Sequence, residues 1–479
     1  MKKQLFFSLL SMSLFVACQS YDAGPSMPDE DDLVVAVAAA EEIRQITADV
    51  NSGEVKNILS SLFGNHCKGR SADYTVSLLK DKQGIDRVIC VNYADNGGFA
   101  LISAEKTHTP ILAYAEEGNF IFGENAPAAL QDWMNYTMCD IADSKSLPVD
   151  SLAKIAIQWR RYEDIPNPLA YDNPEDHSQL KNMTWEEFME CSRKMMDSIN
   201  IWNSNGYRVY AIDDYSGTTS LGDKNALASY VQGRIYPYYM EDYWAVTLIV
   251  EKEFDKGYGK SSVIRTDWEQ ENGFNEVFYG FNYNANDAIQ YPVGCGAIAL
   301  GQIMYYYRYP TTFNWDSMVL KGPGNTATSN FLYDVRTKIQ SEFDKFEVVT
   351  HTYPNKLYNG ILAYGYQCDI IQPSDMTSVN LVEKSPLIML SFLNGNKDEG
   401  HAWVLDGGGG GTTDTYTEIW SFDYNKDFVK FHTDETHSSF RFYYINWGWG
   451  KNNGYYTNLV PKGYNSNTLY LAYRIKPNI

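Results

Sequence analysis

The stretch YPVGCGAIALGQIMYYYRYP, residues 291–310, places one cysteine between two glycines and directly ahead of an apolar run of helical length. Pro292 and Gly294 favour a turn, so we expect Cys295 in the first turn of a helix, near the positive end of its dipole. That position favours the thiolate, which is the nucleophilic form of cysteine. The pattern also fits a buried cysteine in a helix cap, so a catalytic interpretation needs a partner base.

The candidate base is His401, which begins the apolar segment HAWVLDG after the polar stretch NGNKDEG. An imidazole at the start of a strand can face a cleft, and of the seven histidines only this one has such a setting. His432 and His437 are typical of surface residues. A cysteine and a histidine far apart in sequence but joined in space are the expected signature of a thiol acyl-transfer enzyme.

A third segment, YYINWGWGKNNGYY, spans residues 443–456 and carries Asn446. An asparagine amide can hold one imidazole nitrogen and so turn the other towards sulfur. Trp447 would cover that bond from water. The alternative is a β-hairpin whose tryptophans are core residues, and this interpretation is preferred for Trp449.

Together these segments resemble the C10 family of cysteine peptidases, the streptopain-like branch of the papain-fold enzymes. Members also carry a W-x-Q segment before the cysteine, which is here TDWEQENGFN with Gln270. The resemblance implies an α+β fold with a papain-like catalytic domain over residues 256–479. It implies Cys295 as nucleophile, His401 as its acid and base, Asn446 with Trp447 as supports, and Gln270 as an oxyanion donor beside the Cys295 amide.

The interval from Cys295 to His401 is shorter than expected for streptopain itself. Loops of the substrate cleft are therefore expected to be missing or remodelled, and the resemblance says least about substrate preference.

The front of the chain, residues 32–145, predicts a compact α+β unit. A helical opening is followed by the strand-like runs YTVSLLK, RVICVNYA, GGFALISAE and PILAYAEEGNFIF, and a helix closes the unit. It contains no catalytic motif. It resembles the C10 propeptide domain, which implies an intramolecular inhibitor and folding aid. Residues 146–255 are expected to be an insertion or linker of uncertain role.

The N-terminal stretch MKKQLFFSLLSMSLFVACQS predicts an export signal over residues 1–17. A cysteine directly after FVA resembles a bacterial lipobox, which implies that Cys18 is lipidated and that residues 18–31 form a tether. The expected location is the cell envelope, at the outer membrane or cell surface, with plain secretion as the alternative.

Composition and motifs argue against nucleic-acid binding, a metal site and a disulfide framework. The net charge of −21 and the pI near 4.7 argue against nucleic acid as a partner, because such binding needs a basic face. Neither HExxH nor paired Cys/His spacing appears, so no metal or other cofactor is expected. The seven cysteines are irregularly spaced and do not indicate a disulfide framework.

The expected function is that of a zymogen of a cysteine endopeptidase acting on proteins or peptides and activated by loss of its front domain. Two alternatives stay open: a thiol-dependent transpeptidase or amidase, and a non-catalytic surface-binding lipoprotein with a masked site. The glycine run Gly407–Gly411 is expected to form either a surface loop or a flexible flap over the cleft.

Overall fold

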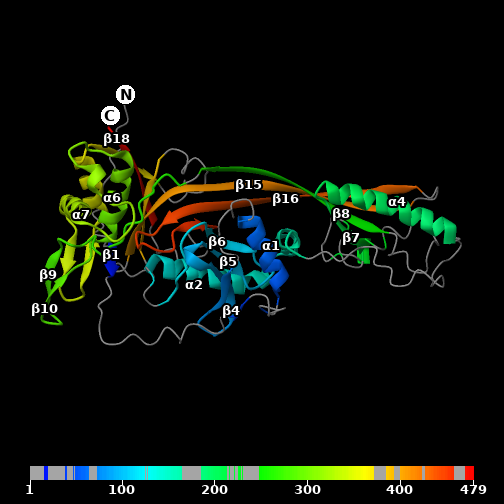
Figure 1. Cartoon of the computed structure of the whole chain (residues 1–479), viewed down its shortest axis with the longest axis horizontal. Coiled ribbons are helices and arrows are strands. Elements are labelled where there is room, and N and C mark those ends of the chain that lie inside the picture. Colours follow the sequence, from blue (N-terminus) through cyan, green and yellow to red (C-terminus); the bar gives the residue numbers. More distant parts are fainter. Residues whose placement is uncertain are drawn as a thin grey trace, which may run out of the picture.

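The computed structural model describes the backbone of these residues: 16–19, 38–39, 47, 49–63, 73–123, 126, 128–163, 185–212, 215, 221, 225–227, 229, 247–260, 262–371, 385–392, 400–422, 427–457 and 470–478. The molecule is elongated and has three parts (Figure 1). We call the described residues among 38–163 the front unit and the part that holds α6, α7 and α8 the rear unit. The arm consists of α4, β7, β8 and residues 412–422 and 428–437.

The front unit is an antiparallel sheet with helices on both faces. Its elements are α1 (Ser52–Phe63), β2 (Ala38–Ala39), β3 (Tyr74–Lys80), β4 (Asp86–Tyr93), β5 (Phe99–Ser103), β6 (Ile111–Ala115), α2 (Ala128–Asp143) and α3 (Val149–Arg160). Helix α1 begins with a capping box, because the Glu54 amide donates to Asn51 Oδ1 (3.0 Å) while the Asn51 amide donates to Glu54 Oε2 (2.9 Å).

Strands β4 and β5 are buried on both faces, which explains their nearly continuous apolar sequences. Ile89 and Val91 face the core formed with α1, whereas Val88 and Cys90 face the core formed with α2. The expected strands and closing helix are thus observed. The expected opening helix lies largely outside the described residues, which show only the short strand β2 there.

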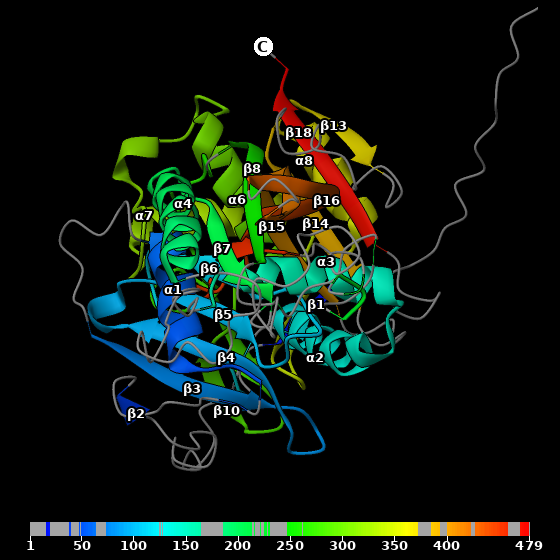
Figure 2. The same cartoon turned by 90° about the vertical axis from the view of Figure 1, so that its right-hand side faces the viewer.

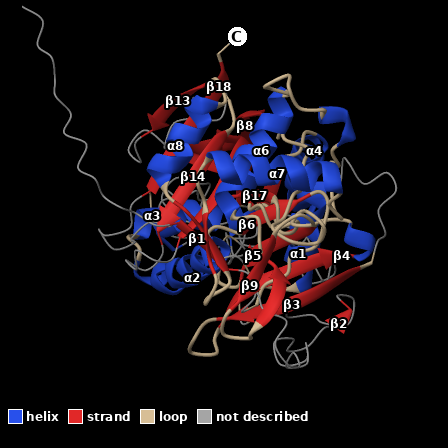
Figure 3. Cartoon of the chain, turned by 90° about the vertical axis from the view of Figure 1, so that its left-hand side faces the viewer, coloured by secondary structure: helices blue, strands red, loops and turns tan. Residues whose placement is uncertain are grey.

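The rear unit is built around α6. Its elements are β9 (Tyr279–Asn282), β10 (Asp287–Gln290), α6 (Cys295–Tyr307), α7 (Thr326–Lys338), β11 (Glu342–Asp344), β12 (Val349–Thr352), α8 (Pro354–Ala363), β13 (Tyr366–Ile371), β14 (Leu387–Phe392), β17 (Gly454–Tyr456) and β18 (Tyr470–Pro477). The three helices pack on one face of the sheet that contains β14 and β18 (Figure 3). Every residue of α6 from Cys295 to Met304 is buried, because the apolar run has neighbours on all sides.

The two units share one sheet and one core. The described strand order is β13-β18-β14-β15-β16-β17-β6-β5-β4-β3-β2, so the front sheet continues the rear sheet through the β17–β6 pair. Trp133 on α2 packs among Met389, Trp403 and Tyr456 of the rear unit in the same cluster as Val88 of the front sheet. Helix α2 therefore completes the core of both units.

The arm is a long antiparallel extension of the rear sheet (Figures 1 and 2). It is formed by the outer parts of β15 (Gly400–Phe422) and β16 (Phe428–Asn446), by β8 (Leu248–Lys260) and β7 (Arg208–Ala211), and by α4 (Trp185–Ser204). Helix α4 buries Met195, Ile199 and Trp202 at helical spacing. Trp202 meets Trp420 and Phe428, with ring centroids 5.1 and 6.1 Å apart.

The glycine run is neither a loop nor a flap. Gly407–Gly411 lies inside β15, where it pairs with β16 on one side while Gly408–Gly411 pairs with β8 on the other. The two expectations for this run were wrong, because hydrogen bonds to strands on both sides hold glycines that sequence reasoning treats as breakers.

The observed mixture of helices with a large antiparallel sheet confirms the α+β prediction. The predicted domain boundaries stay predictions, although packing of Trp159 and Tyr162 in the α1 core carries the front unit past residue 145. Within the predicted 146–255 segment, the described parts form α3, α4, β7 and the start of β8. Among the described residues, no helix is both long and apolar enough to cross a membrane.

Candidate active site

Cys295 is the first residue of α6, as the sequence predicts. Gly294 precedes it with φ of 99°, a left-handed conformation that favours glycine. A Cβ at Gly294 would lie 2.7 Å from Thr350 Cγ2, and one at Gly296 would lie 2.7 Å from Thr352 Cγ2. Both glycines are therefore required by the close approach of β12 to the cysteine turn.

The start of β15, where His401 lies, reaches Cys295 through its backbone. The amide of Ala402, the next residue, donates to Cys295 Sγ over 3.3 Å. Strand β15 brings His401 there because it pairs with β14 in the register His401–Ser391. Both Cys295 and His401 are buried, with exposed fractions of 0% and 4%. The structure thus brings the backbone next to His401 to the Cys295 sulfur, and the catalytic pairing of the two side chains stays a prediction.

The imidazole of His401 is held through the backbone of Trp447. Its Nε2 lies 2.8 Å from the Trp447 carbonyl oxygen. Since a carbonyl only accepts, Nε2 carries the proton and Nδ1 is the nitrogen that can take another. Burial lowers the pKa of His401 to about 4, while the Trp447 carbonyl opposes that shift. The histidine is therefore neutral at pH 7 unless a nearby anion stabilises its charge.

The ring of Trp447 also packs in the site. Its indole is 1% exposed and lies 5.7 Å from the Trp403 ring, which in turn stacks on His401 at 6.2 Å. Trp133 of the front unit lies 4.9 Å from Tyr456, which lies 5.4 Å from Trp447. A continuous row of aromatic rings therefore runs from the front unit to the histidine.

Asn446 directly precedes Trp447 in the chain, and none of its described hydrogen bonds goes to His401. Its Nδ2 donates to the Thr266 carbonyl (2.9 Å) and to Gln302 Oε1 (3.1 Å), and its Oδ1 accepts from Gln302 Nε2 (3.2 Å) and the Gly448 amide (3.0 Å). The direct orientation of His401 by Asn446 stays a prediction. The observed role of the asparagine is to fix the backbone that carries Trp447.

Gln302 is a site residue that the sequence reasoning missed. It lies two turns along α6 from Cys295, is fully buried, and also accepts from the Trp268 amide over 3.3 Å. One side chain thus connects the cysteine helix, the segment of Gln270 and the segment of Trp447. Its signal was a lone polar residue in the apolar run GAIALGQIM, where burial demands hydrogen-bond partners.

Gln270 lies against the turn that precedes Cys295. Its Oε1 accepts from the Gly294 amide (3.1 Å), and its carbonyl accepts from the Val293 amide (3.0 Å). With Oε1 bound to the backbone, the Nε2 group is the remaining donor of the side chain. Asp406 ties the start of this segment to the histidine strand, because its Oδ2 accepts from the Val263 amide over 2.9 Å.

Two cysteine findings bear on the chemistry. Cys295 is disulfide-bonded in this structure, whereas Cys90, Cys139 and Cys368 are free. A nucleophilic thiolate at Cys295 therefore requires prior reduction.

Cys18, the predicted lipidation residue, lies on β1 (Val16–Gln19), whose backbone pairs with β12. Lipidation and cell-envelope location stay predictions.

Among the described residues, no group of histidine, cysteine and carboxylate side chains could hold a metal ion.

Comparisons with known proteins bear on the front unit. Residues 56–140 match the family model described as Spi protease inhibitor. This match supports the prediction of an inhibitory propeptide domain at the front of a protease zymogen. It lies within the predicted range 32–145 and covers the strands β3 to β6 and most of α2.

A search of solved structures matches a mutant fragment of prointerpain A from Prevotella intermedia. The identity is 15% and the TM-score is 0.41, and the match covers 84% of this chain and 98% of that one. No curated protein matches this chain.

Proposed function

We propose that this chain is the zymogen of a cysteine endopeptidase of the C10 type with a papain-like catalytic domain, and that the front unit is its inhibitor. The observation that carries the proposal is the hydrogen bond from the Ala402 amide, the residue after His401, to Cys295 Sγ, together with the bond of His401 Nε2 to the Trp447 carbonyl. Because Nε2 carries the proton, Nδ1 is the nitrogen through which His401 would accept the thiol proton in this proposal.

In the reduced enzyme, Nδ1 of His401 takes the thiol proton, and the Cys295 sulfur attacks a peptide carbonyl carbon. The carbonyl oxygen becomes an oxyanion that accepts hydrogen bonds from the Cys295 amide and Gln270 Nε2. The imidazolium then protonates the leaving amine as the C–N bond breaks, and a thioester remains. Water, deprotonated by His401, attacks the thioester, and the thiol is released together with a carboxylic acid.

The pKa of His401 is consistent with this sequence of steps. Burial holds it low in a site that contains no thiolate. A Cys295 thiolate within the same buried site would raise the pKa of the imidazole, since an opposite charge stabilises the protonated form. The thiolate and imidazolium would therefore form as a pair.

The front unit is suited to inhibition because α2 packs in the same core as Trp403, which stacks on His401, and Trp447, whose carbonyl holds the imidazole. Trp133 begins the row of rings that ends at His401, and α2 shares its core with the strand that carries the histidine. Inhibition would be relieved when the front unit leaves. We further propose that lipid on Cys18 attaches the chain to the cell envelope.

The test uses the full chain, reduced beforehand, and a thiol-directed epoxide inhibitor, beside Cys295→Ala. We expect one adduct at Cys295 after limited proteolysis removes the front unit, and none in the variant. Loss of an N-terminal block from the reduced wild type, but not from Cys295→Ala, would add evidence of self-processing. If the front unit is removed, the cysteine is reduced and no adduct forms, the peptidase proposal fails and a binding protein takes its place.

A further inference from the structure

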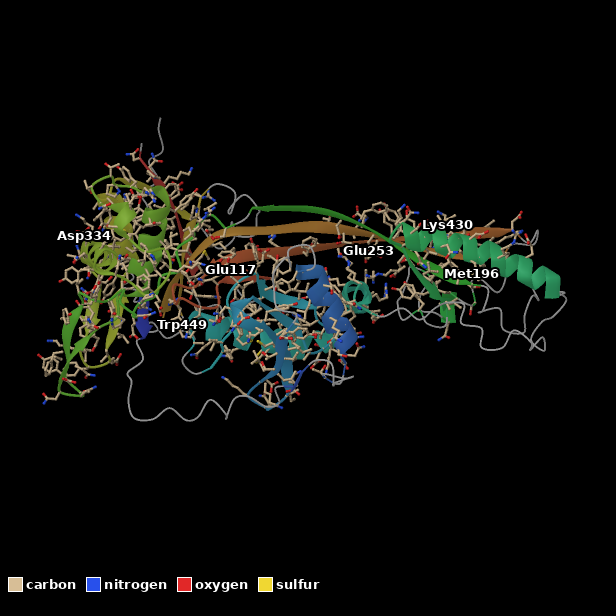
Figure 4. The ribbon with its side chains drawn as sticks, in the orientation of Figure 1. Glu117, Met196, Glu253, Asp334, Lys430 and Trp449 are labelled. Atoms are coloured by element: carbon tan, nitrogen blue, oxygen red, sulfur yellow. The ribbon has the colours of Figure 1, made fainter. Side chains whose placement is uncertain are left out.

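The arm carries a row of carboxylates where it passes over the front unit. Glu251, Glu253 and Asp255 alternate along β8, so their side chains lie on one face of the strand. Figure 4 labels Glu253 in this stretch of the arm. We call these three residues the acidic row. The end of α3 supplies two consecutive arginines, Arg160 and Arg161, that pair with this row.

The inner pair is buried and bidentate. Arg160 Nη2 donates to Glu251 Oε1 over 2.6 Å, and Nε donates to Oε2 over 3.2 Å, with both side chains 1% exposed. Tyr215 donates its hydroxyl to Glu251 Oε1 (3.3 Å), and its ring centroid lies 5.0 Å from the guanidinium carbon. Burial opposes the charge on Arg160, but the Glu251 carboxylate raises its pKa above the ordinary value. This geometry suits a planar guanidinium better than an ammonium group.

The outer pair is nearer to solvent. Arg161 lies 2.9 Å from Glu253 and 3.0 Å from Asp255, measured between nitrogen and oxygen. Asp255 Oδ1 also accepts from the Thr413 hydroxyl over 2.7 Å, which ties the acidic row to β15. The row is therefore a fixed part of the arm.

The residues on either side of the two arginines belong to the front unit. Trp159 and Tyr162 are buried in the α1 core. Trp159 Nε1 donates to the His108 carbonyl (2.7 Å), and Asn57 Nδ2 donates to the Tyr162 carbonyl (2.8 Å). Four consecutive residues thus join two parts of the molecule, because the front unit holds the aromatic pair and the arm holds the arginine pair. We call residues 159–162 the clasp.

We propose that the acidic row is a docking surface for the pair Arg160 and Arg161, separate from the candidate active site, which keeps the front unit bound after the chain is cut between α3 and α4. The proposal rests on the zymogen function proposed above. None of the clasp residues contacts Cys295, His401, Gln270 or Trp447 in the described structure. A single cut in this interval would then leave an inactive complex.

The physical reason is that several contacts act together. Besides the clasp, the front unit meets the rest of the chain through the shared α2 core, the β6–β17 pair and the hydrogen bonds between Ile121 and Asn452, and each contact raises the effective concentration for the others. Removing one partner of a buried ion pair leaves an uncompensated charge, which is more damaging than losing an exposed pair. Retention should therefore depend on the acidic row and not on peripheral ion pairs.

The experiment uses the full chain carrying Cys295→Ala, with a site for a sequence-specific protease inserted between residues 168 and 180. After cleavage, gel filtration at decreasing concentration measures the dissociation constant of the two fragments. We expect Glu251→Gln with Glu253→Gln to weaken the complex about a hundredfold or more. The matched control is Glu117→Gln, which removes an exposed ion pair with Lys321 (2.7 Å) and should change retention less than threefold.

Equal retention of the double variant and the control would overturn the proposal. If the uncut double variant elutes differently from the uncut parent, Arg161→Gln decides instead, because its side chain is 22% exposed and its loss leaves the buried pair intact. That variant should weaken the complex about fivefold to tenfold, and no change would again overturn the proposal. Cys295→Ala lacks the proposed nucleophile, so this experiment does not depend on epoxide labelling of Cys295. Epoxide labelling separately tests the proposed function.

Discussion

Gln302 is expected to hold the catalytic segments in place, and replacing it with methionine tests this. Methionine has a similar volume, no hydrogen-bond donor and only a weak acceptor, so the change removes the polar contacts without opening a large cavity. The Trp268 amide would lose its described partner, which costs about 1–3 kcal/mol for a buried donor. Loss of the reciprocal pair with Asn446 adds about 1 kcal/mol, giving a total of about 2–4 kcal/mol.

The assay for this prediction has two readouts. Urea unfolding of the Cys295→Ala chain, with and without Gln302→Met, measures the stability difference. Epoxide alkylation of the reduced chain with an intact Cys295, after removal of the front unit, measures the reactivity of the thiol. We expect the alkylation rate to fall at least tenfold, because Gln302 connects both the Gln270 and Trp447 segments to α6. An unchanged unfolding midpoint together with an unchanged alkylation rate would refute the reasoning.

Three further predictions follow from the described contacts. Burial lowers the pKa of His401 in the folded chain to about 4 from its ordinary value of 6.5, so the unfolded chain binds a proton first as the pH falls, and the Cys295→Ala chain should lose up to about 3 kcal/mol of stability between pH 6.5 and pH 4. Midpoints of urea unfolding should fall less over this pH range when His401→Gln is added, and equal losses would contradict this prediction. Gly294→Ala should cost about 1–2 kcal/mol from its positive φ and more from the contact with Thr350, so adding Thr350→Ser should rescue only part of the loss in urea unfolding. Trp202→Ala should destabilise the arm by about 3 kcal/mol and raise its cleavage by trypsin, while the alkylation rate of Cys295 stays unchanged.

The sequence allowed prediction of those features whose signals are local. Alternating apolar and polar runs predicted the strands of the front unit, and the Gly-Cys-Gly turn predicted the start of α6. The proximity of Cys295 and His401 was inferred from the combination of chemical types and from family resemblance. In the structure, the Ala402 amide, next to His401, donates a hydrogen bond to Cys295 Sγ.

The remaining features depend on contacts between distant segments. Nothing near Asn446 in the sequence indicates that its amide pairs with Gln302, because a buried polar partner is visible only after folding. The glycine run was misread for the same reason, since glycine has low strand propensity unless neighbouring strands hold it. The arm joins the segment before residue 256 to an extension of the His401 strand, and neither half alone has a complete core.

The core shared by the front and rear units has a consequence for the protein after activation. Departure of the front unit would uncover the β17 edge that pairs with β6, as well as the apolar side chains that pack on α2. An exposed strand edge beside an apolar patch is a template for association with another chain. The mature enzyme should therefore tend to self-associate or adsorb to surfaces as its concentration rises, and a refolding protocol that starts from the isolated rear unit should lose most of its yield to aggregates.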